Sequence, residues 1–183
     1  PATVIGAAAD AHRLPPLDVE VQEGDTVTIG QDSGTVIDVS GHTLGHIAFH
    51  FPRSAVMFTG DSLMALGCGR VFEGTKPQMW VSLQKLAALP SETIICSGHE
   101  YTAANAQFAI TVDPGNQSLK SRIEDIGVAR AAGQYTVPSS LALELDTNPF
   151  LRPEDPSIQA HLGMEGASAS DVFTEIRTRK DNF

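Results

Sequence analysis

The sequence predicts an α/β protein in which strands and one interleaved helix come first and a small helical domain follows. Two observations support this prediction. Apolar runs of four or five residues, rich in β-branched side chains, recur up to residue 96. From residue 103 onward, the apolar residues recur with the spacing of helices. We therefore expect a strand-rich unit over residues 1–102 and a helical unit over residues 103–183.

The strands are predicted by apolar residues that alternate with polar ones, and by the turns between them. Residues 30–34 (GQDSG) form a turn between two such runs, which together predict a hairpin. Pro52 ends the next alternating run, in which Ile47, Phe49 and Phe51 share one face. The expected strands are residues 3–5, 19–21, 26–29, 35–39, 47–51, 55–58 and 93–96.

The helices are predicted by apolar residues three or four apart. Thr75 is a suitable N-cap for a helix that ends before Pro90, and Ser170 is the expected cap of the last helix. The expected helices lie between residues 75 and 90, over 103–112, from about Leu119 to Gly133, and from 170 onward. Residues 134–156 are rich in proline and predict an irregular, extended crossing.

Composition limits the classes of partner. The 183 residues are enough to bury a core, and the formal net charge is −10. A strongly acidic chain argues against nucleic acid or an anionic membrane as the partner. There is no apolar run of the length of a membrane span. The two cysteines, Cys68 and Cys96, cannot build a disulfide framework and fit a reducing cytoplasm.

Three apolar runs end in a hydroxyl residue, a glycine and then a histidine or an aspartate. These turns are Ser40-Gly41-His42, Thr59-Gly60-Asp61 and Ser97-Gly98-His99. Residues just past the ends of buried strands are where α/β proteins place their chemistry. Imidazole and carboxylate are ligands that zinc, iron and manganese accept, and an aspartate can bridge two ions. The repetition predicts that His42, Asp61 and His99 form one metal site.

Other reactive side chains have simpler interpretations. His46 and His50 share a strand face, where packing or hydrogen bonding explains a histidine as well as metal binding does. Cys96 ends a strand and Cys68 lies between two glycines, so we interpret them as a core residue and a turn residue. The sequence contains no nucleophile elbow of the G-x-S-x-G type and no phosphate-binding loop.

The cations of the last helix allow two interpretations. Arg177 and Lys180 are three residues apart and share a helix face. They can complement the helix C-terminus, or they can hold a carboxylate in a cleft. Arg70 and Tyr101 lie just beyond two of the proposed ligands, which favours the cleft, but the residues alone leave both interpretations open.

Several stretches together resemble the glyoxalase II (hydroxyacylglutathione hydrolase) family of the metallo-β-lactamase superfamily. They are GHTLGHIAFHF, FTGDSLMALGCGRVFEGT, CSGHEYTAANAQFA, DPGNQSL, TVPSSLALEL, DTNPFLR and RTRKDNF. The resemblance implies part of an αββα metallo-β-lactamase sandwich followed by a small C-terminal α-helical, glutathione-binding domain. It implies that His42 binds one of two divalent metal ions, that Asp61 bridges them and that His99 binds the other. The substrate-binding positions that it implies are Arg70, Phe72, Tyr101, Arg177 and Lys180, and many relatives have tyrosine in place of Phe72.

The implied reaction is hydrolysis of S-lactoylglutathione to D-lactate and glutathione, as a cytoplasmic step of methylglyoxal detoxification. The ions would be zinc, or mixtures with iron or manganese, and a metal-held hydroxide would attack the thioester. The family's His-x-His-x-Asp-His motif is absent, since no two histidines here are two residues apart. We therefore expect that an N-terminal segment carrying the other ligands is missing, that the sheet has an open apolar face, and that this chain alone hydrolyses near background.

Two other functions fit parts of the pattern. A persulfide dioxygenase-like mononuclear iron enzyme shares the GCGR-like turn, but the helical tail with NPFLR and RKDNF argues against it. An inactive fragment that binds glutathione conjugates is the alternative without catalysis, and the retained His42, Asp61 and His99 argue against that.

Overall fold

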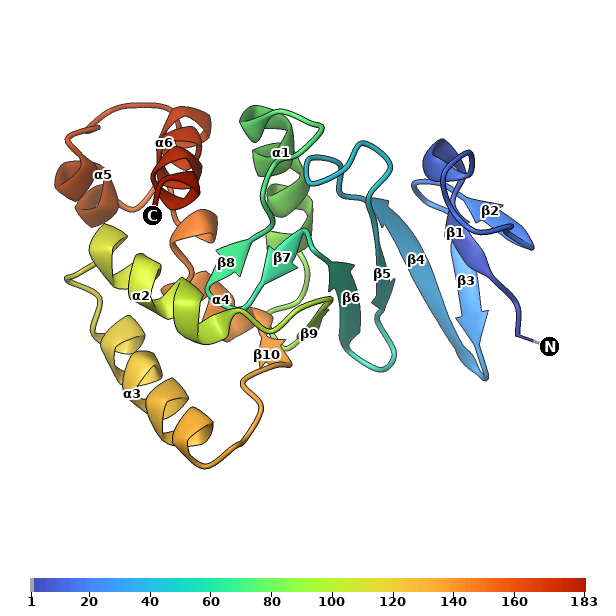
Figure 1. Ribbon diagram of the computed structural model, residues 1–183, viewed down its shortest axis with the longest axis horizontal. Coiled ribbons are helices and arrows are strands. Elements are labelled where there is room, and N and C mark those ends of the chain that lie inside the picture. Colours follow the sequence, from blue (N-terminus) through green and yellow to red (C-terminus); the bar gives the residue numbers. More distant parts are fainter. Residues whose placement is uncertain (1) are drawn as a thin grey trace.

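The computed structural model describes residues 2–183 (Figure 1). Its centre is a six-stranded sheet. In chain order the strands are β3 (Thr26–Ile29), β4 (Asp32–Asp38), β5 (Ile47–Phe51), β6 (Val56–Gly60), β9 (Ile94–Ser97) and β10 (Ser139–Ser140). Their order across the sheet is β10-β9-β6-β5-β4-β3. The predicted α/β class is confirmed.

The strand directions bring the predicted turns to one edge. β4 and β6 are each antiparallel to β5, and β6 is parallel to β9. Consequently β4, β6 and β9 run the same way, and their C-terminal ends lie at the same edge of the sheet. The turns that contain His42, Asp61 and His99 follow these three ends.

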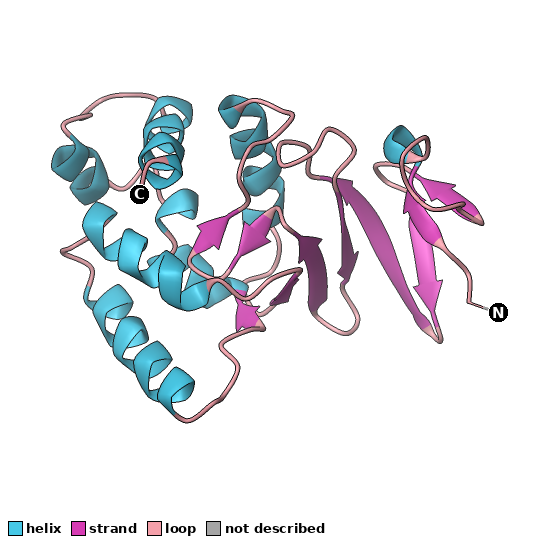
Figure 2. Ribbon diagram, viewed as in Figure 1, coloured by secondary structure: helices cyan, strands magenta, loops and turns pink. Residues whose placement is uncertain are grey.

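Helices make up most of the chain after β9 (Figure 2). They are α2 (Thr102–Val112), α3 (Gln117–Ala131), α4 (Leu141–Thr147), α5 (Pro156–Leu162) and α6 (Ala169–Asp181). Ser168 caps α6, two residues before the predicted Ser170, because its hydroxyl oxygen accepts the Asp171 N–H at 3.2 Å. None of the helices within residues 2–183 is long and apolar enough to cross a membrane.

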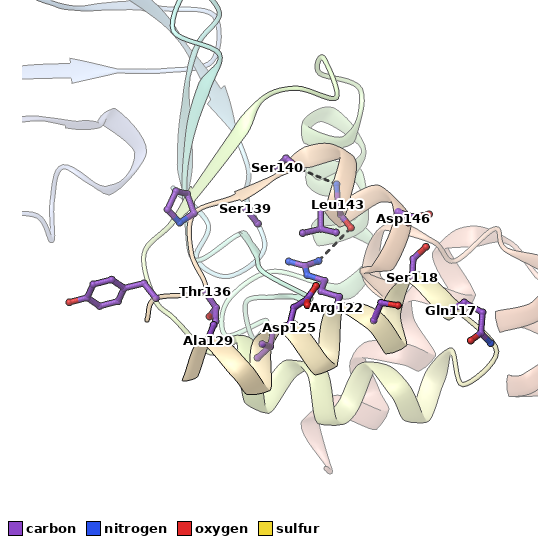
Figure 3. A pocket seen from close by; sticks show the side chains of 14 residues that line it. Gln117, Ser118, Arg122, Asp125, Ala129, Thr136, Ser139, Ser140, Leu143 and Asp146 are labelled. Atoms are coloured by element: carbon purple, nitrogen blue, oxygen red, sulfur yellow. Dashed lines mark hydrogen bonds between the residues drawn. The ribbon is translucent and has the colours of Figure 1, made fainter. Parts of the chain in front are cut away.

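The prediction that residues 134–156 are irregular was wrong. This segment holds β10, α4 and a 3-10 turn at Pro149–Leu151. The Ser140 hydroxyl caps α4 by accepting the Leu143 N–H at 3.2 Å (Figure 3), and Asn148 ends the helix ahead of Pro149. A seven-residue helix spans about two turns, so its apolar spacing gives too short a repeat to stand out among the prolines.

Four short elements also differ from the sequence-based prediction. β1 (Ile5–Ala7) lies two residues beyond the expected strand and pairs in parallel with β2 (Val19–Val21). The hairpin of β7 (Leu63–Met64) and β8 (Gly67–Cys68), with strands of two residues each, was not predicted. Neither was α5. These elements have between two and seven residues, too few for the apolar pattern to recur often enough to stand out.

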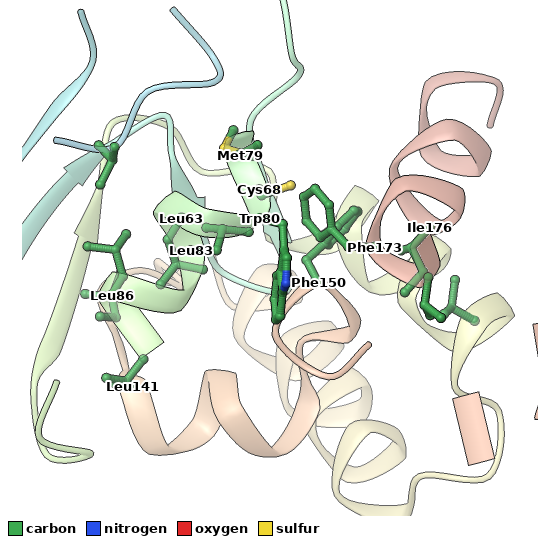
Figure 4. Packing of buried hydrophobic residues seen from close by; sticks show 14 of the residues in the cluster. Leu63, Cys68, Met79, Trp80, Leu83, Leu86, Leu141, Phe150, Phe173 and Ile176 are labelled. Carbon is green, nitrogen blue, oxygen red and sulfur yellow. The ribbon is translucent and has the colours of Figure 1, made fainter. Parts of the chain in front are cut away.

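One continuous core joins the sheet to the helices (Figure 4). Thr75 is the N-cap of helix α1 (Lys76–Ala87), as predicted, and Thr75 and Gln78 cap each other's backbone N–H groups. It buries Met79, Leu83 and Leu86 in the same cluster as Ala48, Met57 and Ile95 of the sheet. Trp80 extends the cluster by stacking on Phe173 of α6 at 5.7 Å between ring centroids. The division into residues 1–102 and 103–183 stays a prediction, because this core includes both parts.

The opposite face of the sheet is covered only in part within residues 2–183. Residues 2–21 cover part of it, with Val21 buried against Val27, Val36 and Phe51. Beyond that cover, Phe58 is 47% exposed and lies beside a cavity of about 510 Å³. Within residues 2–183, β3 pairs only with β4, so it is an edge strand. The expected open apolar face is therefore present.

A buried ion pair ties the helices to the β7–β8 hairpin. The Glu144 carboxylate is fully buried and accepts hydrogen bonds from Arg122 Nη2 at 2.5 Å and from the Leu66 N–H at 2.8 Å. The Ser139 hydroxyl and the Asn148 amide donate to the same carboxylate at 2.6 and 3.1 Å. One carboxylate thus connects α3, α4, β10 and the hairpin turn.

Replacing Arg122 by Met should lower the free energy of unfolding by about 3–5 kcal/mol, because it leaves a buried carboxylate without its counter-charge. Urea unfolding at neutral pH measures the change. The matched control is Arg130→Met, which breaks a more exposed pair with Glu100 at 3.1 Å and should destabilise the protein far less, because solvent screens that pair.

A double variant tests the cause. Adding Glu144→Gln to Arg122→Met removes the unpaired charge and keeps an oxygen that can accept the Leu66 N–H. The double variant should therefore be more stable than Arg122→Met alone. Equal stability of the two variants would show that lost packing, and not the buried charge, causes the destabilisation.

Candidate active site

The structure brings His42, Asp61 and His99 together at the edge where β4, β6 and β9 end. His42 Nε2 lies 3.6 Å from Asp61 Oδ2, and His99 Nδ1 lies 2.7 Å from Asp61 Oδ1. Each oxygen of the Asp61 carboxylate therefore faces a different histidine. This arrangement suits a carboxylate that bridges two ions, although the role of each residue as a ligand stays a prediction.

A backbone contact sets the orientation of His42. Its Nδ1 lies 2.7 Å from the carbonyl oxygen of Arg70. Because a carbonyl only accepts, the ring must carry its N–H on Nδ1, which leaves the lone pair of the neutral ring on Nε2, facing Asp61. Such an outer partner is typical of metal-binding histidines.

His46 forms a hydrogen bond with the backbone of Asp61. Its Nε2 accepts the backbone N–H of Asp61 at 3.0 Å, so Nε2 is unprotonated. Burial, and then the neighbouring His42, lower the pKa of His46 below its ordinary value, which favours that neutral form. The sequence suggested packing or hydrogen bonding for His46, and the structure gives it this hydrogen bond beside the site.

Close backbone packing holds the site together. A Cβ on Gly69 would lie 1.9 Å from the carbonyl oxygen of Asp61 and 3.1 Å from His42 Nδ1. Gly60 has φ +52°, a conformation that L side chains rarely adopt. Glycine is therefore required at these points for Asp61 to sit where it does.

All eight predicted site residues line one cavity of about 420 Å³. They are His42, Asp61, Arg70, Phe72, His99, Tyr101, Arg177 and Lys180. The ring of Phe72, 66% exposed, lies 5.1 Å from that of His42, and Tyr101 stacks on His99 at 5.3 Å. Two aromatic walls thus flank the histidines.

The two arginines of the cavity contact other groups of the protein. Arg177 is nearly buried, donates to the Cys68 carbonyl at 3.0 Å and pairs with Asp181 at 3.0 Å. Arg70 lies 3.6 Å from the same Asp181. Arg177 is therefore held in place at the wall of the cavity, whereas Arg70 is more than half exposed and contacts the same carboxylate more loosely.

Lys180 is half-buried and lies beside two aromatic rings. Its Nζ is 5.1 Å from the ring centroid of Phe108 and 5.2 Å from that of Phe183. Burial, and then Arg177, lower the pKa of Lys180 below its ordinary value. Both helix cations line the cavity, which favours the cleft interpretation over a simple role at the helix end, and their contact with a substrate stays a prediction.

The donor atoms fit part of a metal site. Two ligand atoms of one tetrahedral ion lie about 3.4 Å apart when each bond is about 2.1 Å. The 3.6 Å between His42 and Asp61 agrees with this distance, whereas the 2.7 Å between His99 and Asp61 is a direct hydrogen bond that would have to open. Among residues 2–183, no group of three or more histidine, cysteine, aspartate or glutamate side chains is arranged to hold an ion by itself. These residues therefore suit an incomplete ligand set.

A larger cavity lies elsewhere, between α3 and residues 135–146 (Figure 3). Its volume is about 740 Å³, and none of the predicted site residues lines it. Its arginine, Arg122, is held by Glu144 and by the Thr147 hydroxyl at 2.6 Å. The smaller cavity is the better candidate because it combines histidines, a carboxylate and three cations.

The sequence of each part of the chain matches a known family. The profile described as "Metallo-beta-lactamase superfamily" matches residues 7–99, and that described as "Hydroxyacylglutathione hydrolase C-terminus" matches residues 100–183. A protein of Ruegeria pomeroyi named hydroxyacylglutathione hydrolase is 64% identical over 99% of this chain, which spans 71% of that protein.

Solved structures show the same fold. ETHE1 from Myxococcus xanthus is 26% identical, with a TM-score of 0.63 over 98% of this chain and 59% of that one. A di-iron-bound form of TTHA1623 is also 26% identical, with a TM-score of 0.51 over 81% of this chain and 65% of that one. The strand-rich part and its edge site thus define a metallo-β-lactamase fold. Together with its helical part, the chain belongs to the hydroxyacylglutathione hydrolase family.

Replacing Gly69 by Ala should destabilise the protein by about 1–3 kcal/mol and displace Asp61, because the added methyl group overlaps its carbonyl oxygen. Thermal unfolding measures the stability, and histidine ring NMR signals report the displacement. The control is Gly115→Ala, where an added Cβ meets no atom within 4 Å. Similar effects of the two substitutions would contradict the close packing described at Gly69.

Proposed function

We propose that the cavity around His42, Asp61 and His99 is the active site of a metal-dependent thioesterase. The reaction is hydrolysis of S-lactoylglutathione by water to D-lactate and glutathione. The observation that carries the proposal is the convergence of all eight predicted residues on one cavity. Membership of the hydroxyacylglutathione hydrolase family supports the substrate class.

The cofactor that we propose is a pair of divalent ions, zinc or mixtures with iron or manganese. The likeness to TTHA1623, described in a di-iron-bound form, supports a two-ion site. When bound, the ions supply a water-derived nucleophile at neutral pH and polarise the thioester carbonyl. The ligands that we assign are His42, Asp61 and His99, and the remaining ligands would come from outside residues 2–183.

The protein's own groups prepare this site. The Arg70 carbonyl and the His46 ring fix His42 and the Asp61 backbone, so the donor atoms are oriented before anything binds. The three cations, Arg70, Arg177 and Lys180, gather positive charge in a chain whose net charge is −10. This local concentration supports an anionic tripeptide as the group that is held. Phe72 offers an apolar ring where a tyrosine would offer a hydroxyl.

Two neighbouring functions fit less well. The match of residues 100–183 to the hydroxyacylglutathione hydrolase C-terminus supports the hydrolase over a persulfide dioxygenase-like enzyme. Binding of glutathione conjugates without turnover remains an outcome that the experiment below can reveal. A cytoplasmic location and a role in methylglyoxal detoxification are proposals that rest on family membership alone.

The decisive experiment measures metal content and thioester cleavage together. We expect the 183-residue chain alone to hold metal weakly and to cleave S-lactoylglutathione near background. Adding the upstream segment of the Ruegeria pomeroyi relative, fused or as a separate chain, should raise both, and Asp61→Asn should abolish the gain. Full activity of the 183 residues alone, with stoichiometric metal, would show that the ligand assignment is wrong.

In the complemented protein, replacing Lys180 by Ala should raise KM for S-lactoylglutathione much more than it lowers kcat. A contact remote from the reacting bond holds substrate and transition state equally, so its loss affects KM. Steady-state kinetics of the variant test this. The control is Arg179→Ala on the same helix, whose side chain pairs with Glu175 at 2.8 Å. An unchanged KM in the Lys180 variant would contradict a role in substrate binding.

A further inference from the structure

An ion-pair cluster of three residues, outside the cavity, holds the loop that carries His42. Arg13 forms a two-pronged pair with Glu73, in which Nη1 contacts Oε1 and Nη2 lies 2.9 Å from Oε2. The same Nη2 lies 2.8 Å from Asp10 Oδ2. Arg13 and Asp10 belong to the N-terminal residues 2–21, which do not line the cavity, and Glu73 follows β8. We call these three residues the outer clamp.

Glu73 also contacts the loop that contains His42. Its Oε2 accepts the backbone N–H of Leu44, two residues after His42, at 2.8 Å. Beside it, the Phe72 N–H donates to the His42 carbonyl at 3.2 Å, and the Gly74 N–H donates to the Gly41 carbonyl at 3.1 Å. Residues 70–74 are thus joined to residues 41–44 by hydrogen bonds that include the Arg70 contact of the His42 ring.

Asp10 packs against the other side of this loop. A Cβ on Gly45 would lie 2.3 Å from Asp10 Cγ, so the backbone of the loop lies directly against this carboxyl group. Asp10 is itself nearly buried. The loop from Gly41 to Gly45 is therefore held between Asp10 and the segment that carries Glu73.

The outer clamp contributes more to geometry than to the stability of the fold. Arg13 and Glu73 are each about one-third exposed, with side-chain exposures of 37% and 32%. Solvent screens pairs of this exposure, so they contribute little to stability. Their geometry is more specific than their energy, since a planar guanidinium that bridges two carboxylates fixes both of them in direction.

We propose that Asp10, Arg13 and Glu73 are positioning residues that hold the His42 ring in its orientation towards Asp61. They act through the Leu44 N–H and the backbone contacts of the loop. The proposal rests on the proposed function only in treating His42 as a metal ligand. The orientation of the ring can be measured without metal.

The test compares Arg13→Met with Arg179→Met in the 183-residue chain. Each change removes a surface arginine that pairs with a glutamate, but only Arg13 belongs to the clamp. In metal-free protein, long-range ¹H–¹⁵N spectra of the histidine rings should show His42 with its proton on Nδ1, and Arg13→Met should convert this signal to a tautomer mixture. Affinity for Zn²⁺, from competition with a chelator, should fall about tenfold in Arg13→Met and stay unchanged in Arg179→Met.

Two further variants separate positioning from general destabilisation. Arg13→Lys keeps one charged contact, so its His42 signal and its Zn²⁺ affinity should lie between those of the wild type and Arg13→Met. Glu73→Gln keeps an oxygen for the Leu44 N–H and should also give an intermediate result. The thermal midpoint of each of these two variants should differ from that of the wild type by no more than the midpoint of Arg179→Met does.

Unchanged ring tautomer in Arg13→Met, or an equal loss of affinity in Arg179→Met, would overturn the proposal. A third result would also overturn it: Arg13→Met unfolds, while Arg13→Lys and Glu73→Gln fold like the wild type and keep its full His42 signal. The clamp would then affect stability alone. If the wild-type chain binds no measurable Zn²⁺, the affinity comparison is made in the chain complemented with the upstream segment, and the His42 tautomer in the 183-residue chain still decides the role of the clamp.

Discussion

The buried carboxylate of Glu144 is the constraint on which the geometry of the site depends. It fixes the Leu66 N–H in the turn of the β7–β8 hairpin and is itself held by Arg122. The hairpin leads directly into Gly69, which packs against Asp61, and into Arg70, whose carbonyl orients the His42 ring. A charge buried among the helices is thus connected, through a two-residue strand and a glycine, to the Arg70 carbonyl that contacts the His42 ring.

The two parts of the chain are consequently interdependent. The helical part supplies more than a wall of the cavity, because the Asn148 amide donates to the carbonyls of Met64 and Gly67, and Asn105 donates to that of Ala65. These contacts satisfy backbone carbonyls of the hairpin, whose two strands pair only with each other within residues 2–183. The site therefore lies between the two segments that the family profiles match, residues 7–99 and 100–183, rather than inside either segment. The shared apolar core, with Trp80 stacked on Phe173, agrees with this interpretation.

The sequence was informative where a pattern repeats over several residues or recurs along the chain. Strand 47–51 and the Thr75 cap were predicted because alternation and capping are local, and the three strand-end turns indicated His42, Asp61 and His99 by repetition. The hairpin at 63–68 and α4 were missed because they are too short to show a period. The support given by His46 to Asp61, and the link from Arg13 to Glu73, join residues that are distant in the chain. No local pattern reports such pairs.

The glycine packing around Asp61 divides the cavity into two zones with different tolerance to change. We call the three glycines packed around Asp61 the floor: an added Cβ would lie 2.6 Å from His46 Nε2 at Gly60, 1.9 Å from the Asp61 carbonyl oxygen at Gly69 and 2.9 Å from Asp61 Oδ1 at Gly98. The rim of the cavity consists of long side chains such as Phe72 and Lys180, which extend from the surrounding loop and helix. Substitutions at the rim can alter what is recognised without moving the floor. Evolution, or a designed library, can therefore diversify selectivity at the rim while the chemistry beneath it stays fixed.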